Sequence, residues 1–337
     1  MKPFSPEPLE FFGCRREHLE LKDALAQRAV EVLTKGKMLQ GPEVSTFEAE
    51  VSAISGRKHA VCVGSATDAL FFSLRALGIG PGDEVLLPDI SFFASAAAVL
   101  RVGATPVLID IDQSCNLDLG RATTRITNRT RAILFVQLYG GMSDPHAIEE
   151  FAREHKLVVV EDAAQSFGAR FGDRRCGGTG NVSVFSFDPT KPISAPGSGG
   201  AVLTDDAELA ARVRRLRYHG RQNGHYLELG YNSQLPSLAA ALLSLKLQKH
   251  SYWTARRRMI ADHYYSSFKH LPVEFPCWAT SVEHVWHKFT LRTRERNQLA
   301  AYLASAGVPI MIHYPTPFHR EPLLNQNATA DFEYPVA

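Results

Sequence analysis

The stretch RAILFVQLYGGMSDPHAIEEFAREHKLVVVED, residues 131–162, carries the pattern that decides the fold. It begins and ends with short apolar runs, RAILFV (131–136) and LVVVED (157–162), which are typical of strands buried on both faces of a sheet. Between them, DPHAIEEFAREH (144–155) spaces its apolar residues as one face of a helix does. Two strands joined by a helix are predicted to lie parallel, because the connection crosses over the sheet.

The same alternation extends in both directions along the chain. Further buried strands are predicted at HAVCV (59–63), EVLLP (84–88), TPVLID (105–110) and VSVFSF (182–187). Helical patterns lie between them at TDALFFSLRALG (67–78) and FASAAAVLRVG (93–103). We therefore predict an α/β fold whose large, mostly parallel sheet is built from right-handed crossover units.

The regions outside this alternation are mostly helical. Amphipathic or long helices are predicted at residues 19–35, 43–54, 205–216, 236–247 and 250–269. The segment 281–317 mixes short strand-like and helical pieces, with HVWHKFTLR and VPIMIHYP on either side of RNQLAAYLASAG. We divide the chain into residues 1–250, with the N-terminal helices and the large α/β domain, and residues 251–337, a small C-terminal α+β domain.

Composition excludes several classes of protein. The 337 residues are 45% hydrophobic and 21% charged, which is typical of a globular chain with a large core. A net charge of +2 gives no strong field for nucleic acid or an acidic membrane surface. The sequence has no apolar run of the roughly 18 residues that span a membrane. Its five cysteines form no C-x-x-C pair, and the N-terminus lacks the layout of a secretory signal, so we expect a cytoplasmic protein.

Two motifs resemble familiar sites but favour other interpretations. The glycines of Gly78-Ile79-Gly80-Pro81-Gly82 stand after a helix and before a strand, the reverse of the order in a dinucleotide-binding loop, so we predict a helix end and a turn. His284 and His287 form an H-x-x-H pair in a strand-like segment, which would place their rings on opposite faces. We therefore predict no metal site.

Three features could carry chemistry. Gly64-Ser65-Ala66-Thr67-Asp68 follows a strand and opens a helix, which suits either a phosphate or a plain helix cap. Asp162 ends the most apolar strand, where a carboxylate either serves a ligand or caps the next helix. Lys191 precedes a proline and so lies on a turn or extended loop, either presenting an amine into a cavity or exposed to solvent.

Together, these features favour one cofactor. Pyridoxal phosphate needs a cradle for its phosphate, a carboxylate that keeps its ring nitrogen protonated, and a lysine that binds its aldehyde covalently. Lys191 would then also carry the proton between substrate and cofactor carbons. Ser186, on the adjoining strand, offers a hydroxyl near the same place.

Several blocks of sequence, in order, resemble a known family. They are SATDAL (65–70), ALGIGPGDEVLLP (76–88), VEDAAQSFGA (160–169), FSFDPTK (185–191), GSGGAVLT (197–204), YNSQL (231–235) and IHYP (312–315). From about Gly41 to its end, the chain resembles the DegT/DnrJ/EryC1/StrS family of pyridoxal-phosphate-dependent sugar aminotransferases. The resemblance implies the fold type I, aspartate-aminotransferase-like architecture with a large seven-stranded sheet. It also implies further small-domain elements beyond the final EYPVA, which leaves open that this domain is truncated.

The resemblance implies a role for individual residues. Ser65, Ala66 and Thr67 would hold the phosphate, with Ser186 adding a hydroxyl. Phe92 would stack on the cofactor ring, Asp162 would pair with its nitrogen, and Gln165 would lie beside its phenolic oxygen. Lys191 would bind the cofactor covalently. Asn232 would reach the phosphate of the neighbouring subunit in a homodimer with shared active sites, and His313 and Tyr314 would lie near the sugar.

The implied activity is transfer of an amino group from L-glutamate or L-glutamine to a keto sugar, carried on a nucleotide, in amino-sugar biosynthesis. Three alternatives stay open. A sugar dehydratase of the same fold would have histidine in place of Lys191. A non-catalytic, cofactor-binding regulator or sensor would retain the fold alone. A nicotinamide-dependent reductase would share the α/β pattern, but the order of the glycines opposes it.

Overall fold

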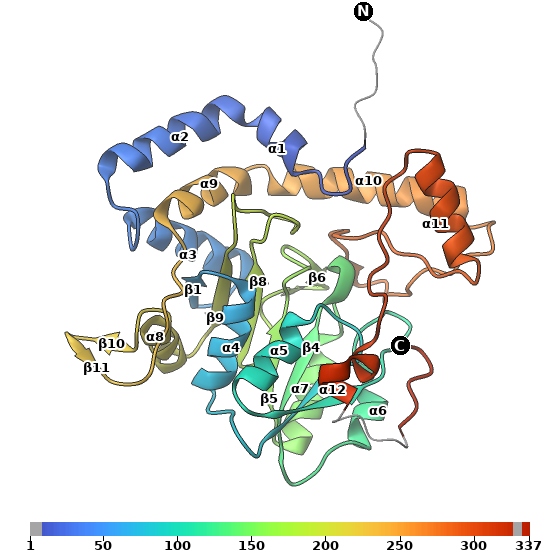
Figure 1. Cartoon of the computed structure of the whole chain (residues 1–337), viewed down its shortest axis with the longest axis horizontal. Helices are drawn as coiled ribbons and strands as arrows, with labels where there is room; N and C mark the ends of the chain where they lie inside the picture. Colours follow the sequence, from blue (N-terminus) through green and yellow to red (C-terminus); the bar gives the residue numbers. More distant parts are fainter. Residues whose placement is uncertain (1–8, 326–331) are drawn as a thin grey trace, which may run out of the picture.

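A seven-stranded sheet forms the centre of the protein in the computed structural model, which describes residues 9–325 and 332–337 (Figure 1). Its strand order is β1-β9-β8-β5-β4-β2-β3. The strands are β1 (His59–Val63), β2 (Glu84–Pro88), β3 (Thr105–Ile109), β4 (Thr130–Val136), β5 (Val158–Asp162), β8 (Val182–Ser186) and β9 (Gly200–Thr204). Strand β9 is antiparallel to both of its neighbours, β1 and β8, and the remaining neighbours are parallel. The predicted large, mostly parallel sheet is confirmed.

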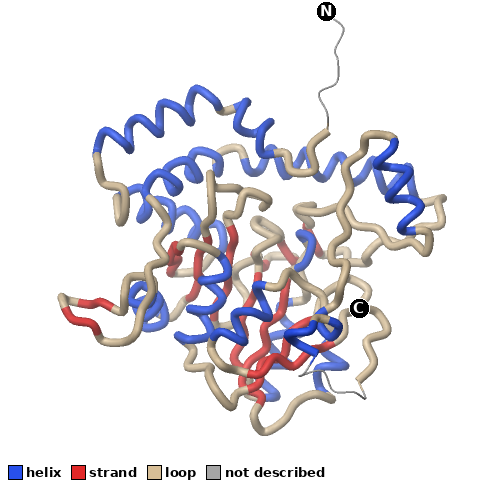
Figure 2. The backbone as a smooth tube through the Cα atoms, viewed as in Figure 1, coloured by secondary structure: helices blue, strands red, loops and turns tan. Residues whose placement is uncertain are grey.

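Helices cover both faces of the sheet (Figure 2). One face packs against α4 (Ala66–Ala76), α5 (Ala94–Arg101) and α8 (Ala207–Leu216), and the other against α3 (Pro42–Ser55), α6 (Leu119–Thr123), α7 (Pro145–His155) and α9 (Ser237–Leu247). Successive residues of a strand enter opposite layers: Val61 and Val63 pack on the first side, whereas Ala60 and Cys62 pack on the second. This double burial explains why the strands are continuous apolar runs.

The N-terminal helices lie beside the helical layer of α9. Helices α1 (Cys14–Glu20) and α2 (Lys22–Lys35) run along one side of the molecule, near α9 and α10 (His250–Phe268) (Figure 1). The helix predicted at 19–35 thus begins five residues earlier than expected and is interrupted at Leu21. No helix within the described ranges is long and apolar enough to cross a membrane.

The C-terminal part differs from the prediction. It contains α11 (Arg296–Ser305), but neither HVWHKFTLR nor VPIMIHYP forms the expected strand. Trp286 has a φ of 53°, which is incompatible with extended backbone. The short strand β12 (Val282–Glu283) instead pairs with β6 (Arg170–Phe171), which pairs with β7 (Arg174–Arg175).

The end of the chain returns to the large sheet. Phe318, in the 3-10 helix η2 (Phe318–Arg320), and Leu324, in α12 (Pro322–Asn325), are buried in the core beside α4 and α5. A second short 3-10 helix, η1 (Leu138–Gly140), follows β4, and the hairpin of β10 (Arg221–Gln222) and β11 (His225–Tyr226) extends outward (Figure 1). Segments on both sides of residue 250 therefore contact each other, and the division at that residue stays a prediction.

Candidate active site

The start of α4 forms a small anion-binding cradle. Ser65 is the N-cap, and its Oγ accepts a hydrogen bond from the Asp68 amide at 3.1 Å. The amide N–H groups of Ala66 and Thr67, at the positive end of the helix, donate to none of the described residues. Gly200 of β9 lies against this turn, and a Cβ there would be 2.6 Å from the Ala66 nitrogen. The cap interpretation is thus correct for Ser65, and two further donors stay available for a phosphate.

Asp162 lies at the carboxyl end of β5, fully enclosed. Its Oδ2 accepts a hydrogen bond from the Ser95 hydroxyl at 2.7 Å, and its Oδ1 accepts one from the Ala164 amide at 3.2 Å. Burial raises the pKa of Asp162, although these hydrogen bonds and the charge of Lys191 partly oppose the shift. No basic side chain of the described residues forms an ion pair with it. A protonated ring nitrogen is the partner that such a carboxylate lacks.

Lys191 occupies the loop between β8 and β9, close enough to Asp162 for their charges to interact. Burial lowers the pKa of Lys191, while Asp162 and Asp188 oppose the shift. A larger share of its amine is therefore uncharged near neutral pH and able to attack an aldehyde. Its Nζ lies 5.9 Å from the centroid of the Phe92 ring, which is 56% exposed. That ring is free to stack on a planar ligand bound at Lys191.

Gln165 joins the large sheet to the C-terminal segment. Its Oε1 accepts a hydrogen bond from the Tyr139 amide at 3.0 Å, and its Nε2 donates to the Tyr314 hydroxyl at 3.1 Å. The Tyr139 hydroxyl in turn donates to the carbonyl of His313. Burial raises the pKa of Tyr314 to about 12, so its hydroxyl is protonated at neutral pH. The structure thus brings together Gln165, His313 and Tyr314, and their roles beside the cofactor and the sugar stay predictions.

Ser186 and Asn232 come from two other segments, the end of β8 and the loop before α9. Ser186 ends β8, is buried, and its Oγ accepts a weak hydrogen bond from the Asp188 amide at 3.4 Å. Asn232 is exposed, and its backbone bridges to Tyr218. The adjacent Ser233 accepts a hydrogen bond from Gly64 at 3.0 Å, which anchors the Asn232 loop at the cradle.

These groups fit pyridoxal phosphate. Two unpartnered amides stand at the cradle, a buried carboxylate lacks a cation, and an amine of lowered pKa stands beside an exposed aromatic ring. The roles of the individual residues stay predictions. The described residues contain no group of three or more His, Cys, Asp or Glu side chains that could hold a metal.

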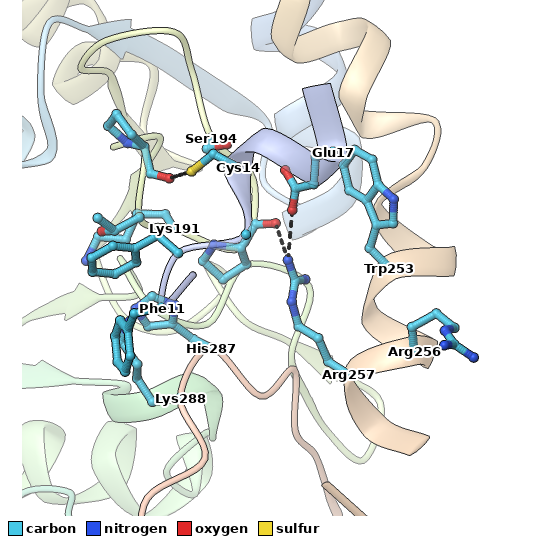
Figure 3. A pocket seen from close by; sticks show the side chains of 15 residues that line it. Phe11, Cys14, Glu17, Lys191, Ser194, Trp253, Arg256, Arg257, His287 and Lys288 are labelled. Atoms are coloured by element: carbon cyan, nitrogen blue, oxygen red, sulfur yellow. Dashed lines mark hydrogen bonds and ion pairs between the residues drawn. The ribbon is translucent and has the colours of Figure 1, made fainter. Parts of the chain in front are cut away.

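A cavity of about 260 Å³ lies beside Lys191 (Figure 3). Its lining includes residues from the N-terminal segment, the Lys191 loop, α10 and the segment after β12: Phe11, Phe12, Cys14, Glu17, Lys191, Pro192, Ser194, Trp253, Arg256, Arg257, His287 and Lys288. His287 therefore lines this cavity, whereas His284 packs between Trp278 and Trp286. The H-x-x-H pair is therefore divided between two environments.

Three charged residues hold α1 over the Lys191 loop. Glu17 pairs with Arg257 at 3.3 Å (Figure 3). It also pairs with Lys246 at 3.2 Å. Lys246, whose side chain is 1% exposed, also donates to the carbonyl and hydroxyl of Ser194 at 2.8 and 2.6 Å. Arg257 donates to the carbonyl of Pro192 at 3.4 Å, and the Cys14 thiol donates to a neighbouring carbonyl in the same loop.

We expect Glu17→Gln to lower the free energy of unfolding by about 3 kcal/mol, because it leaves Lys246 and Arg257 buried without a counter-charge. Urea denaturation of the apoprotein measures the change. Glu150→Gln, which removes an exposed ion pair with Arg153, is the control and should change stability far less. Equal effects of the two substitutions would contradict the prediction.

The comparisons with known proteins agree with this geometry. Residues 20–337 match the profile of the DegT/DnrJ/EryC1/StrS aminotransferase family. The chain is 42% identical to the erythromycin biosynthesis sensory transduction protein EryC1 of Saccharopolyspora erythraea, over 97% of this chain and 90% of that protein. It is 41% identical to the dTDP-3-amino-3,4,6-trideoxy-alpha-D-glucose transaminase of Streptomyces venezuelae, over 97% and 87%. The crystal structure of S. venezuelae DesV superposes with a TM-score of 0.94 at 40% identity, covering 98% of this chain and 90% of that one.

The fold and the site define a fold type I, pyridoxal-phosphate-dependent aminotransferase. The chain belongs to the DegT/DnrJ/EryC1/StrS aminotransferase family. Its cofactor is pyridoxal 5′-phosphate, and its activity is amino-group transfer from an amino donor to a keto sugar in amino-sugar biosynthesis. The reductase alternative is excluded by this membership.

Proposed function

We propose that the enzyme moves an amino group from L-glutamate or L-glutamine to a keto-deoxy sugar carried on a nucleotide. The observation that carries the proposal is the position of Lys191, which interacts with buried Asp162 and also lines a cavity rich in cationic side chains. Cationic side chains favour anionic substrates such as a nucleotide diphosphate. The S. venezuelae relative acts, by its name, on a dTDP-linked sugar.

Different residues of this chain would bind the cofactor, hold its ring nitrogen protonated and transfer protons. Pyridoxal phosphate supplies, when bound, an electron-withdrawing ring that carries the amino group between the two substrates. Ser65, Ala66 and Thr67 would hold its phosphate, and Asp162 would keep its ring nitrogen protonated. Lys191 would take the proton from the donor α-carbon and would later deliver one to the sugar carbon. Its lowered pKa suits both directions of transfer.

A colour test followed by a substrate screen examines this proposal. Purified protein loaded with cofactor should lose its visible absorbance on addition of L-glutamate or L-glutamine, and a nucleotide keto sugar should restore it. Screening 3-keto and 4-keto nucleotide sugars by product mass would identify the acceptor. Protein that binds the cofactor but responds to neither L-glutamate nor L-glutamine would contradict this proposal and is the result that the sensor alternative predicts. Lys191, in place of the histidine of the dehydratases, opposes the dehydratase.

We also propose a homodimer in the cytoplasm, with Asn232 reaching the phosphate site of the partner subunit. Exposed apolar side chains on and after α2 (Val30, Leu33, Met38 and Leu39) support an interface beside the helical layer. Buried, unpaired Cys62, Cys115 and Cys176 are typical of a reducing compartment.

Mixing two inactive variants tests the shared site. Lys191→Ala and Asn232→Ala subunits, unfolded and refolded together, should regain about one quarter of wild-type activity, because half of randomly paired dimers contain one intact site of two. Assay of the mixture against each variant refolded alone gives the answer. Activity no higher than the sum of the separate variants would show that each subunit has a self-contained site.

A further inference from the structure

The cavity beside Lys191 has an unbalanced charge. Its lining contains four basic side chains, Lys191, Arg256, Arg257 and Lys288, but Glu17 is its one carboxylate among the described residues. Glu17 is already paired with Arg257 and with Lys246, and Lys246 does not line the cavity. The positive charge that faces the cavity is therefore not balanced by carboxylates of the lining. A bound anion would balance it.

Lys288 has no counter-ion among the described residues. It is partly buried and forms no ion pair with any carboxylate of residues 9–325 or 332–337, although Asp188 acts on it at longer range. Arg257, by contrast, has Glu17 and the Pro192 carbonyl as partners. Even so, the Nη1 atom of Arg257 is buried without an acceptor, so a second donor on the same wall is also unsatisfied.

Two aromatic rings hold the Lys288 side chain in place. Its Nζ lies 4.7 Å from the centroid of the Phe11 ring and 4.6 Å from that of Phe12. The Phe11 ring stacks on His313, with centroids 5.8 Å apart and planes 10° from parallel. A cation–π contact leaves the three N–H groups of an ammonium able to donate elsewhere. The rings thus fix the position of the charge without neutralising it.

We propose that Lys288, held by Phe11 and Phe12, binds a carboxylate or phosphate oxygen of a substrate and so determines substrate specificity at the Lys191 cavity. This inference rests on the aminotransferase function proposed above and adds the residue that recognises the anion. The N-terminal segment is then part of the active site. The anion is either the carboxylate of the amino donor or the diphosphate of the nucleotide sugar, and the two are separated by experiment.

Anion binding at Lys288 is expected to depend on pH. Burial, with help from the charge of Lys191, lowers the pKa of Lys288 to about 8, while Asp188 opposes the shift. The other titratable groups nearby are His287 and His313, and burial lowers the pKa of each, so both are neutral above pH 7. As pH rises through about 8, Lys288 loses its charge, and the affinity for the anionic substrate is expected to fall.

Binding measurements on the holoenzyme test the proposal with two probes. The first is L-glutamate, followed by the loss of visible absorbance in a single half-reaction, and the second is UDP, followed by calorimetry without turnover. Lys288→Met should weaken one of the two by about 10- to 100-fold, the range for a charged hydrogen bond. Lys288→Arg should retain the affinity and abolish its decrease above pH 8, because arginine stays charged. Lys249→Met, which removes a lysine outside the cavity, is the matched control.

Each outcome has a distinct meaning. Weaker L-glutamate binding assigns Lys288 to the donor carboxylate, and weaker UDP binding assigns it to the diphosphate. Wild-type affinity of Lys288→Met for both probes, in protein that keeps its visible absorbance, overturns the proposal. A wild-type enzyme that responds to no amino donor would refute the aminotransferase proposal instead, and the UDP measurement would still test Lys288. Should Lys288→Met not fold, an unchanged pH dependence in Lys288→Arg is the contradicting result.

Discussion

Lys191→Ala is expected to abolish amino transfer, with a decrease in turnover on the order of 10⁴-fold or more, because one side chain both binds the cofactor and carries the proton. The structure supports a single lysine in this role. Lys191 is the amine whose charge interacts with buried Asp162, and the Phe92 ring stands beside it. Lys246 is occupied by Glu17 and Ser194, and Lys288 lies over Phe11 and Phe12.

Absorbance and stability measured together distinguish loss of chemistry from loss of fold. The Lys191→Ala variant should lack the visible absorbance of the lysine-bound cofactor. It should still unfold at a urea concentration no lower than that of the wild type, because a partly desolvated amine is removed from the site. Lys249→Ala serves as the control, since its amine pairs with exposed Glu20. Unchanged colour and turnover in Lys191→Ala would show that another lysine is used.

The fold was predictable wherever local pattern and burial agree. Six strands of the large sheet follow from apolar runs, because strands covered on both faces contain few polar residues. Strand β9 was missed, since its GAVLT begins with glycine after a run of small residues and its antiparallel pairing depends on distant β1. HVWHKFTLR alternates like a strand, but Trp286 turns the chain and its ring packs against Tyr265 and Phe289.

The candidate site could likewise be predicted only in part. Ser65, Asp162 and Lys191 stand next to strand or helix ends, so their positions follow from the neighbouring elements. Ser95 could not be recognised as a site residue, because its hydrogen bond to Asp162 joins residues 67 positions apart. The sequence of α5 is also that of an ordinary apolar helix. Phe11 and Lys288 are separated by almost the whole chain, so no local pattern predicts their contact.

Asp162→Asn is expected to lower turnover by about 10²- to 10³-fold, the usual effect of removing one preorganised electrostatic partner of the reacting group. An amide has nearly the same shape: its oxygen can still accept from the Ala164 amide, and its NH2 group would donate to the Ser95 hydroxyl in place of the bond that Asp162 accepts. The main change is therefore the loss of the negative charge. Because burial raises the pKa of Asp162, the ionised carboxylate is less favourable in the folded apoprotein than in the unfolded chain. The stability of the apoprotein therefore falls as pH rises through the native pKa, and the Asp162→Asn substitution would remove that loss.

Ser95→Ala provides the matched comparison, because it removes one hydrogen bond and keeps the negative charge. Its turnover should fall by about tenfold or less, the worth of a hydrogen bond to a charged group.

Cofactor affinity and apoprotein stability should respond differently to Asp162→Asn. With cofactor bound, a charge on Asp162 is stabilised by the protonated ring nitrogen, so Asp162→Asn should bind cofactor more weakly. Its apoprotein, by contrast, should be at least as stable as the wild type. Fluorescence titration with pyridoxal phosphate and urea denaturation of both variants measure the two effects. Equal losses of turnover in Asp162→Asn and Ser95→Ala would mean that orientation of the side chain, and not its charge, is what the reaction requires.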